Sequence, residues 1–142
     1  MKALISEAAW EHAALEVLGE LGWVPASGSD INDERTSASD LVLPERFEAA
    51  LRKLNPGVPA PRLRQAVTDI LTPTSQDPIT ENKRLHDLMV SGYRGVTWTD
   101  HEGTTHNPTI RLISHAPSDH DWLAVHQVPL QDREHRRRLD VG

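Results

Sequence analysis

The spacing of apolar residues changes at Gly92, and this change limits the folds open to the chain. Before it, apolar residues recur at helical spacing; after it, they alternate in short runs typical of strands. The helices expected are 6–21, 44–54, 61–71 and 78–90, and the strands expected are 96–99, 109–114 and 122–130. A brief strand at 23–24, ended by Pro25, is the exception to this order. The pattern predicts a mixed α+β (α/β) fold.

Local signals predict where the helices begin and end. Ser6 and Asp77 precede helical segments and can accept hydrogen bonds from free backbone N–H groups, so both are expected N-caps. Gly22 and Gly92 follow helical segments, where glycine commonly ends a helix. The first helix carries one apolar stripe that we expect to face the core: Trp10, Ala14, Val17, Leu18 and Leu21.

Size and composition exclude several classes of protein. The 142 residues suffice for one domain, 1–142, and no apolar run is long enough to cross a membrane. The absence of cysteine excludes disulfides and cysteine-ligated zinc, and it fits a cytoplasmic protein. The net charge of −6 argues against a surface that attracts nucleic acid everywhere, although Arg133, Arg136, Arg137 and Arg138 form a dense basic cluster.

Familiar motifs for cofactors and nucleophiles are missing from the sequence. It contains neither GxxxxGK[ST] nor GxGxxG, so we expect no nucleotide site in this chain. It contains no GxSxG and no cysteine nucleophile. Eight histidines are present, but the six between His101 and His135 are spaced irregularly, which favours surface and turn histidines over a zinc site.

Two acidic residues of the first helix allow two interpretations. Glu7 and Glu11 lie four residues apart and share one helix face. Helical periodicity alone favours a solvated flank for Glu11. The alternative is a carboxylate that leans into a cleft and helps to hold a divalent metal.

The final residues also allow two interpretations. The strand 122–130 is followed by a polar, basic stretch, QDREHRRR, and then by LDV, which begins another strand. Residue types alone favour a hairpin turn followed by a short tail. The alternative places Asp140 at a phosphate and metal site, with Arg136, Arg137 and Arg138 steering a phosphodiester.

Taken in order, the segments resemble the N-terminal region of the motor and nuclease (R) subunit of type I restriction enzymes. No single motif carries the resemblance, which extends over essentially the whole chain. The blocks are SEAAWEHAALEVLGELGW, ERTSASDLVLPERFEAALRKLNPGVPAPRLRQAV, ENKRLHDLMVSGYRGVTW, TIRLI, HDWLAVHQVPL and RRRLDV. The last block has Leu139 where the family usually has proline.

The resemblance implies a PD-(D/E)xK nuclease, with a restriction-endonuclease-like core that is incomplete here and a helical insertion at 44–91. Asp140 would be the first metal-binding carboxylate and Glu11, rather than Glu7, the supporting helix carboxylate. The expected metal is Mg²⁺. Gln127 matches a polar position of the family without an assigned role. From their charge, we expect Arg136, Arg137 and Arg138 to contact DNA.

The family's Glu-x-Lys pair would follow Asp140, and this sequence does not include it. We therefore expect an amino-terminal piece of the subunit that does not cut DNA alone. The implied partners are DNA and the modification and specificity subunits of a restriction-modification complex. Two alternatives remain: a non-catalytic binding module, and a small nucleic-acid binder that uses the basic residues 133–138.

Overall fold

The structure is a computed structural model that describes residues 6–141, apart from the side chains of Asp132, Asp140 and Val141. Within that part of the chain, four α-helices and two small sheets confirm the expected mixed α+β class, which is consistent with an α/β nuclease-like fold. The chain divides into two compact units, Met1–Leu43 with Asp121–Gly142, and Pro44–His120. The single domain with a helical insertion at 44–91 remains a prediction.

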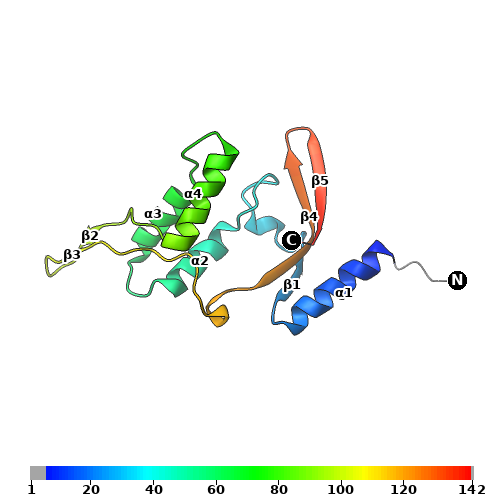
Figure 1. Cartoon of the computed structure of the whole chain (residues 1–142), viewed down its shortest axis with the longest axis horizontal. Coiled ribbons are helices and arrows are strands. Elements are labelled where there is room, and N and C mark those ends of the chain that lie inside the picture. Colours follow the sequence, from blue (N-terminus) through cyan, green and yellow to red (C-terminus); the bar gives the residue numbers. More distant parts are fainter. Residues whose placement is uncertain (1–5, 142) are drawn as a thin grey trace. The chain divides into compact units, whose positions relative to one another are not determined.

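The first unit is built on a three-stranded sheet (Figure 1). Its strands lie in the order β1-β4-β5, with β1 parallel to β4 and β5 antiparallel to β4. Helix α1 contacts both β1 and β4. The elements are α1 (Glu7–Glu20), β1 (Val24–Ser27), the 3₁₀ turn η1 (Asn32–Glu34), β4 (Leu123–Asp132) and β5 (His135–Val141).

Both predicted ends of α1 are confirmed. The Ser6 hydroxyl accepts a hydrogen bond from the backbone N–H of Ala9 at 3.3 Å. At the other end Gly22 adopts φ 92° and donates to Gly19, while Trp23 donates to Leu18. This pair of bonds is a Schellman motif, which satisfies carbonyls that a helix end otherwise leaves free.

The predicted apolar stripe of α1 is wrong at every residue except Leu18, which turns inward. Trp10, Val17 and Leu21 are 63%, 55% and 71% exposed. The face that the helix turns inward carries Glu11, Leu15 and Leu18, which are half-buried. Helix α1 packs on the sheet through a polar contact as well as an apolar one, so apolar spacing did not identify the inward face.

Strand β1 corrects the expectation that Pro25 ends the strand. It continues through Pro25 to Ser27, paired with β4 alone. An edge strand tolerates proline because one of its sides makes no ladder hydrogen bonds. The buried residues Ile31, Val125 and Val128 form the core of this unit.

Arg35 closes the loop that follows β1. Its guanidinium donates to the carbonyl oxygens of Ala38 at 2.7 Å, Asp40 at 3.0 Å and Pro129 at 2.7 Å. The side chain is buried, and these three bonds satisfy a charge that would otherwise be costly to bury.

The second unit contains the helices α2 (Pro44–Leu54), α3 (Ala60–Leu71) and α4 (Pro78–Ser91), the short strands β2 (Trp98–Thr99) and β3 (Thr105–His106), and the 3₁₀ turn η2 (Pro117–Asp119). Its core comprises Leu51, Leu63, Ala66, Ile70, Val96 and Ile110. The Asp77 side chain accepts from the backbone N–H of Thr80 at 2.9 Å, as predicted for an N-cap.

The strand predicted at 109–114 is wrong. Ile110 makes only an isolated bridge with Tyr93, and the segment passes over the helices without a sheet partner. Asn55 anchors it, because its side chain accepts from the Arg111 N–H at 2.7 Å and donates to the Arg111 carbonyl at 2.9 Å. A side chain thus replaces the missing strand neighbour.

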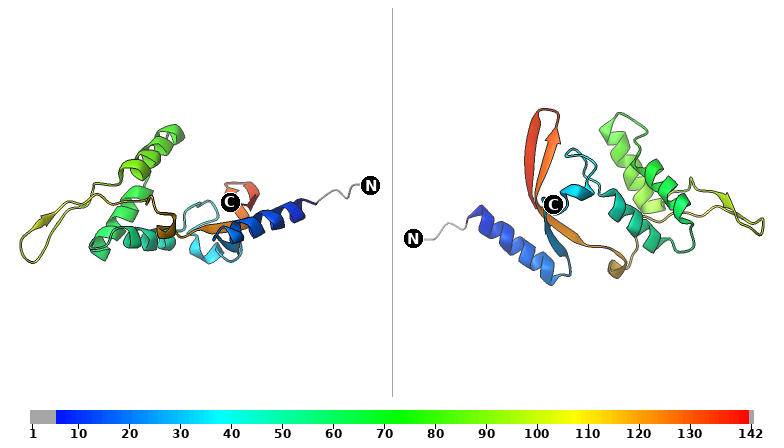
Figure 2. Two further views of the ribbon diagram at one scale, coloured as in Figure 1. Left: turned by 60° about the horizontal axis from the view of Figure 1, so that its bottom comes forward. Right: turned by 180° about the vertical axis from the view of Figure 1, so that it is seen from behind.

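The β2–β3 hairpin extends away from the three helices of the second unit (Figure 2). Asp100 stabilises its turn by accepting from the N–H groups of Glu102 and Thr104. The other oxygen of Asp100 pairs with His106 at 2.6 Å, and the His106 ring stacks on Trp98. His106 therefore has a structural role in this hairpin.

Candidate functional site

The candidate site lies in the first unit, where α1 meets β4. Its side chains line a shallow groove of about 350 Å³: Ala8, Glu11, His12, Leu15, His126 and Gln127. Glu11 reaches this groove because it lies one helical turn before Leu15, on the inward face of α1. Only 12% of its side chain is exposed, so the interpretation of Glu11 as a solvated flank is wrong.

Two consecutive residues of β4 hold the Glu11 carboxylate. Gln127 donates from Nε2 to Oε1 at 2.9 Å and to Oε2 at 2.7 Å. His126 Nδ1 lies 2.9 Å from Oε1. An ionised carboxylate can only accept hydrogen bonds, so Nδ1 of His126 carries the proton. The pair fixes the position of Glu11 from two directions.

The backbone of β4 makes this double contact possible. Side chains of a regular strand alternate between its faces, so His126 and Gln127 would normally point apart. Gln127 instead adopts φ 55°, in the left-handed region that residues other than glycine seldom occupy. Val125 and Val128 on either side both lie in the core, and the two polar residues between them both reach Glu11.

Gly28 leaves room for this conformation. A Cβ atom at Gly28 would lie 2.3 Å from the carbonyl oxygen of Gln127 and 2.9 Å from Cδ of Pro129. The Gly28 N–H also donates to the His126 carbonyl at 2.7 Å. The chain after β1 therefore lies directly against the backbone of Gln127.

The hydrogen bonds determine the charge state of Glu11. The bond from Gln127 is the largest effect and lowers the pKa of the Glu11 carboxyl, and His126 and the charge of Arg138 lower it further. Burial acts in the opposite direction and is outweighed. Glu11 is therefore an ionised, fixed carboxylate at neutral pH.

The assignment of Glu11 and Asp140 as metal ligands remains a prediction. Asp140 lies in β5, and the pairs His126↔Val141 and Val128↔Leu139 on either side place its backbone across from Gln127. Its side chain lies outside the described residues, so the convergence of Glu11 and Asp140 remains a prediction.

The predicted basic turn is a strand. Arg136, Arg137 and Arg138 belong to β5, and the turn itself is at Arg133 and Glu134, with Arg133 at φ 52°. All three β5 arginines are exposed. They pair in register with Gln131, Leu130 and Pro129 of β4. Their contact with DNA remains a prediction.

The Glu11 carboxylate has the free acceptor position needed to act as one ligand of a hydrated magnesium ion. A carboxylate offers about four acceptor positions. Oε1 accepts from His126 and Gln127, and Oε2 accepts from Gln127 alone among the described residues, so Oε2 keeps one position. Among the side chains described, no group of three acidic or histidine residues could hold a metal. Mg²⁺ is commonly held by one or two carboxylates and several waters.

Sequence reasoning missed His126 as a site residue and left Gln127 without a role. Both lie within a strand whose apolar neighbours indicate burial, which is the one local signal that polar side chains there need partners. The sequence could not identify the partner, because Glu11 lies 116 residues before Gln127.

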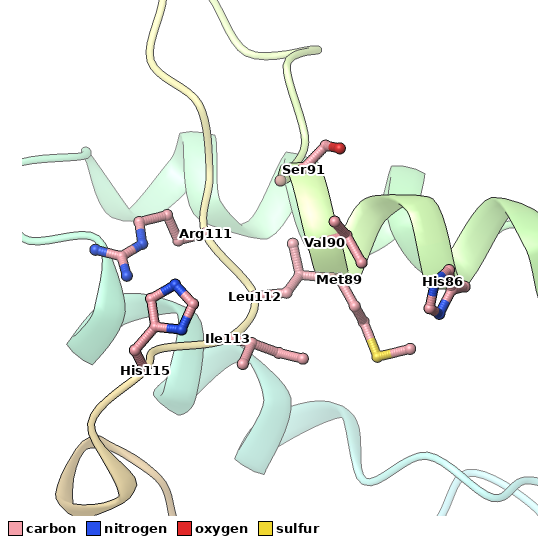
Figure 3. Close-up of a pocket in the computed structure, with 9 residues that line it drawn as sticks. His86, Met89, Val90, Ser91, Arg111, Leu112, Ile113 and His115 are labelled. Atoms are coloured by element: carbon pink, nitrogen blue, oxygen red, sulfur yellow. The ribbon is translucent and has the colours of Figure 1, made fainter.

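A second hollow lies within the second unit, between the end of α4 and the segment after Ile110. It encloses about 490 Å³ and is lined by His86, Met89, Val90, Ser91, Gly92, Arg111, Leu112, Ile113 and His115. Met89 and Ile113 point toward the same space, with Arg111 and His115 at one side (Figure 3). Met89, Val90 and Ile113 are 44%, 72% and 46% exposed, so this hollow has an apolar surface open to solvent.

The fold is consistent with a nuclease-like α/β protein, and its groove contains a fixed carboxylate. The chain belongs to the family described as type I restriction enzyme R protein N terminus, whose model matches residues 4–142.

A curated relative is the type I restriction enzyme HindI endonuclease subunit of Haemophilus influenzae, 25% identical over 142 residues. The alignment covers 96% of this chain and 13% of that subunit, so the chain spans a small part of the relative's length. No solved structure matches the chain. In the described part of the chain, no helix combines the length and apolar character needed to cross a membrane.

Proposed function

We propose that this chain forms part of the nuclease region of a type I restriction R subunit, and that the full-length protein cleaves DNA phosphodiesters with Mg²⁺. Family membership supports the class of protein. The observation that carries the proposal is the ionised Glu11 carboxylate, held in a groove by Gln127 and His126. A fixed anion with one acceptor position left suits a hydrated divalent cation.

The proposed roles follow from the chemistry of these residues. Glu11 and Asp140 would hold Mg²⁺, which would activate water and neutralise charge that grows on the phosphate oxygens. Arg136, Arg137 and Arg138 contact the DNA backbone through charge-assisted hydrogen bonds. His126 and Gln127 keep Glu11 ionised and in place.

Cleavage by the full-length subunit in its restriction complex tests the metal site. We expect Asp140→Ala and Glu11→Gln to lower plasmid cleavage at saturating Mg²⁺ by at least about 10-fold to 100-fold, the range for weakened metal sites. Glu20→Gln, an exposed charge change at the other end of α1, is the matched control. Wild-type cleavage by both site variants would overturn the proposal, provided that their melting temperatures match that of the control. The 142-residue chain alone should leave plasmid DNA intact.

Salt dependence tests the proposed DNA contacts. Each of Arg136→Ala, Arg137→Ala and Arg138→Ala that removes a phosphate contact should reduce the slope of log affinity against log salt by about 1. Arg64→Ala, an exposed arginine of α3, serves as the control. DNA binding that does not respond to salt would contradict a backbone contact.

A non-catalytic docking module is the second candidate, and the open apolar hollow beside α4 favours it. In this candidate the chain binds a modification or specificity subunit. Met89→Asp should abolish co-purification with that subunit, whereas Ile79→Asp, an exposed change at the opposite end of α4, should not. Equal retention of the partner by both variants would exclude the hollow as the docking surface.

A further inference from the structure

We propose that Gln127 is a positioning residue that fixes the Glu11 carboxylate for cation binding, and that Gly28 provides the space for its left-handed backbone. This inference rests on the metal site proposed above. It adds a role for two residues that are not expected to touch the cation or the DNA.

Gln127 has an unusual backbone conformation for a residue inside a strand. Left-handed conformations outside glycine are unfavourable, and they persist where the surrounding structure holds them. Gln127 adopts φ 55° inside a ten-residue strand, at the point where β4 passes beyond its pairing with β1. The pairing with β5 keeps the same register on both sides of it. The strand therefore has no β-bulge relative to β5 at Gln127 that would explain the left-handed conformation.

Gln127 has close neighbours on two sides. On one side the chain at Gly28 approaches so closely that a Cβ atom there would lie 2.3 Å from the Gln127 carbonyl oxygen. On the other side the Gln127 amide donates to both oxygens of Glu11. The residue is thus held by its backbone at Gly28 and by its side chain at Glu11.

The contacts from β4 determine which lone pairs of the Glu11 carboxylate stay free. Oε1 accepts from both His126 and Gln127, which occupies its two lone pairs. Oε2 accepts from Gln127 and retains one lone pair. The amide therefore stops rotation of the carboxylate and leaves one oxygen ready to bind a cation. Without it, His126 alone would hold Glu11 through a single bond.

Three variants separate the effect of the Gln127 side-chain amide from the effect of its backbone conformation. Gln127→Gly adopts the left-handed conformation without strain and lacks the amide. Gln127→Asn also tolerates that conformation, but its amide is one carbon shorter. Gln131→Asn makes the same change four residues along β4, where the side chain donates to the Arg133 carbonyl. Thermal melting would show that all three variants fold.

Two readouts on the 142-residue chain test the inference without cleavage. The first is the pH profile of the Glu11 carboxyl ¹³C signal, which needs no metal: both Gln127 variants should shift its midpoint upward, and Gln131→Asn should not. The second is Mn²⁺ broadening of signals around Glu11, for which the Gln127 variants should need about 10-fold more Mn²⁺, as when an outer partner of a metal ligand is removed.

The outcomes are distinguishable. An upward pH shift together with weaker Mn²⁺ broadening in both Gln127 variants supports the inference. An unchanged Glu11 pH profile in both variants overturns the positioning role, whatever the metal does. A shifted profile with no broadening near Glu11 in the wild-type chain overturns the metal site proposed above, and with it the cation role of Gln127.

Discussion

Gln127 donates its side-chain amide to both carboxylate oxygens of Glu11, at 2.9 and 2.7 Å, across 116 residues of sequence. The contact joins the first helix of the chain to a strand near its end. It turns an acidic residue that periodicity places on a solvated flank into a fixed anion.

Glu11 makes the stability of the first unit depend on pH. Its folded pKa lies below the ordinary value of 4.5, chiefly because of the Gln127 hydrogen bond. The stability that the ionised Glu11 carboxylate contributes to folding is therefore complete above pH 4.5, and it is lost as the pH falls through the folded pKa. Urea midpoints should be lower for Glu11→Gln than for wild type at pH 7, and the difference should vanish in acid. Glu20→Gln is the control; a difference that persists unchanged into acid would contradict the prediction.

Gly28 is required by the close approach to Gln127. Gly28→Ala would place Cβ 2.3 Å from a backbone oxygen, so the chain must shift. We expect a loss of about 1–3 kcal/mol in the free energy of unfolding, as for other overpacked sites. Gly19→Ala is the matched control, because no atom lies within 4 Å of its added Cβ and the residue is helical. That control should gain about 0.5–1 kcal/mol in urea unfolding.

Asn55 holds the second unit together through hydrogen bonds to Leu51 and Arg111. It is buried, and its amide donates to the carbonyls of both residues while its oxygen accepts from the Arg111 N–H. Asn55→Ala should cost about 1–3 kcal/mol, because it removes the partner of the Arg111 N–H and carbonyl, whereas the Leu51 carbonyl keeps its bond from the Asn55 backbone N–H. Asn82→Ala, an exposed change on α4, should have almost no effect. Equal urea midpoints for the two variants would count against the bridge.

Tyr93 should titrate well above its ordinary range. Burial and its hydrogen bond to Asp69 raise its pKa from 10.0 to about 12. The chain has one tyrosine, so ultraviolet absorbance reports Tyr93 alone. A raised folded pKa adds stability that is complete below the unfolded value and lost as pH rises through the folded one.

Asp69→Asn removes the negative charge beside Tyr93 while burial remains. The absorbance midpoint should therefore move downward, only part of the way to 10.0. Tyr93→Phe should show no tyrosine transition. A wild-type midpoint near 10.0 in folded protein would refute the hydrogen bond from Tyr93 to Asp69.

Local chemistry was sufficient to predict the helices. Pro44 at the start of α2, Asp77 before α4 and Gly22 after α1 act on backbone groups within a few residues, so their effects are visible in sequence. The turn between β2 and β3 is also local in origin, since Gly103 adopts φ 83° there.

Strands and burial were harder to predict because they depend on partners elsewhere in the chain. The alternation over 109–114 was that of a strand, but no neighbouring strand pairs with the segment beyond the single bridge at Ile110. The apolar stripe of α1 was regular, but Trp10 is exposed because the sheet packs on the face that carries Glu11. Periodicity shows that a helix has faces and leaves open which face is covered.

The sequence by itself determined the class of fold, the ends of the helices and the membership of a restriction-enzyme family. Only the tertiary structure decided that Glu11 is half-buried on the inward face of α1, that His126 and Gln127 hold it, and that Gly28 makes their position possible. The physical reason is that caps and turns act over a few residues, whereas the site depends on contacts between segments more than a hundred residues apart.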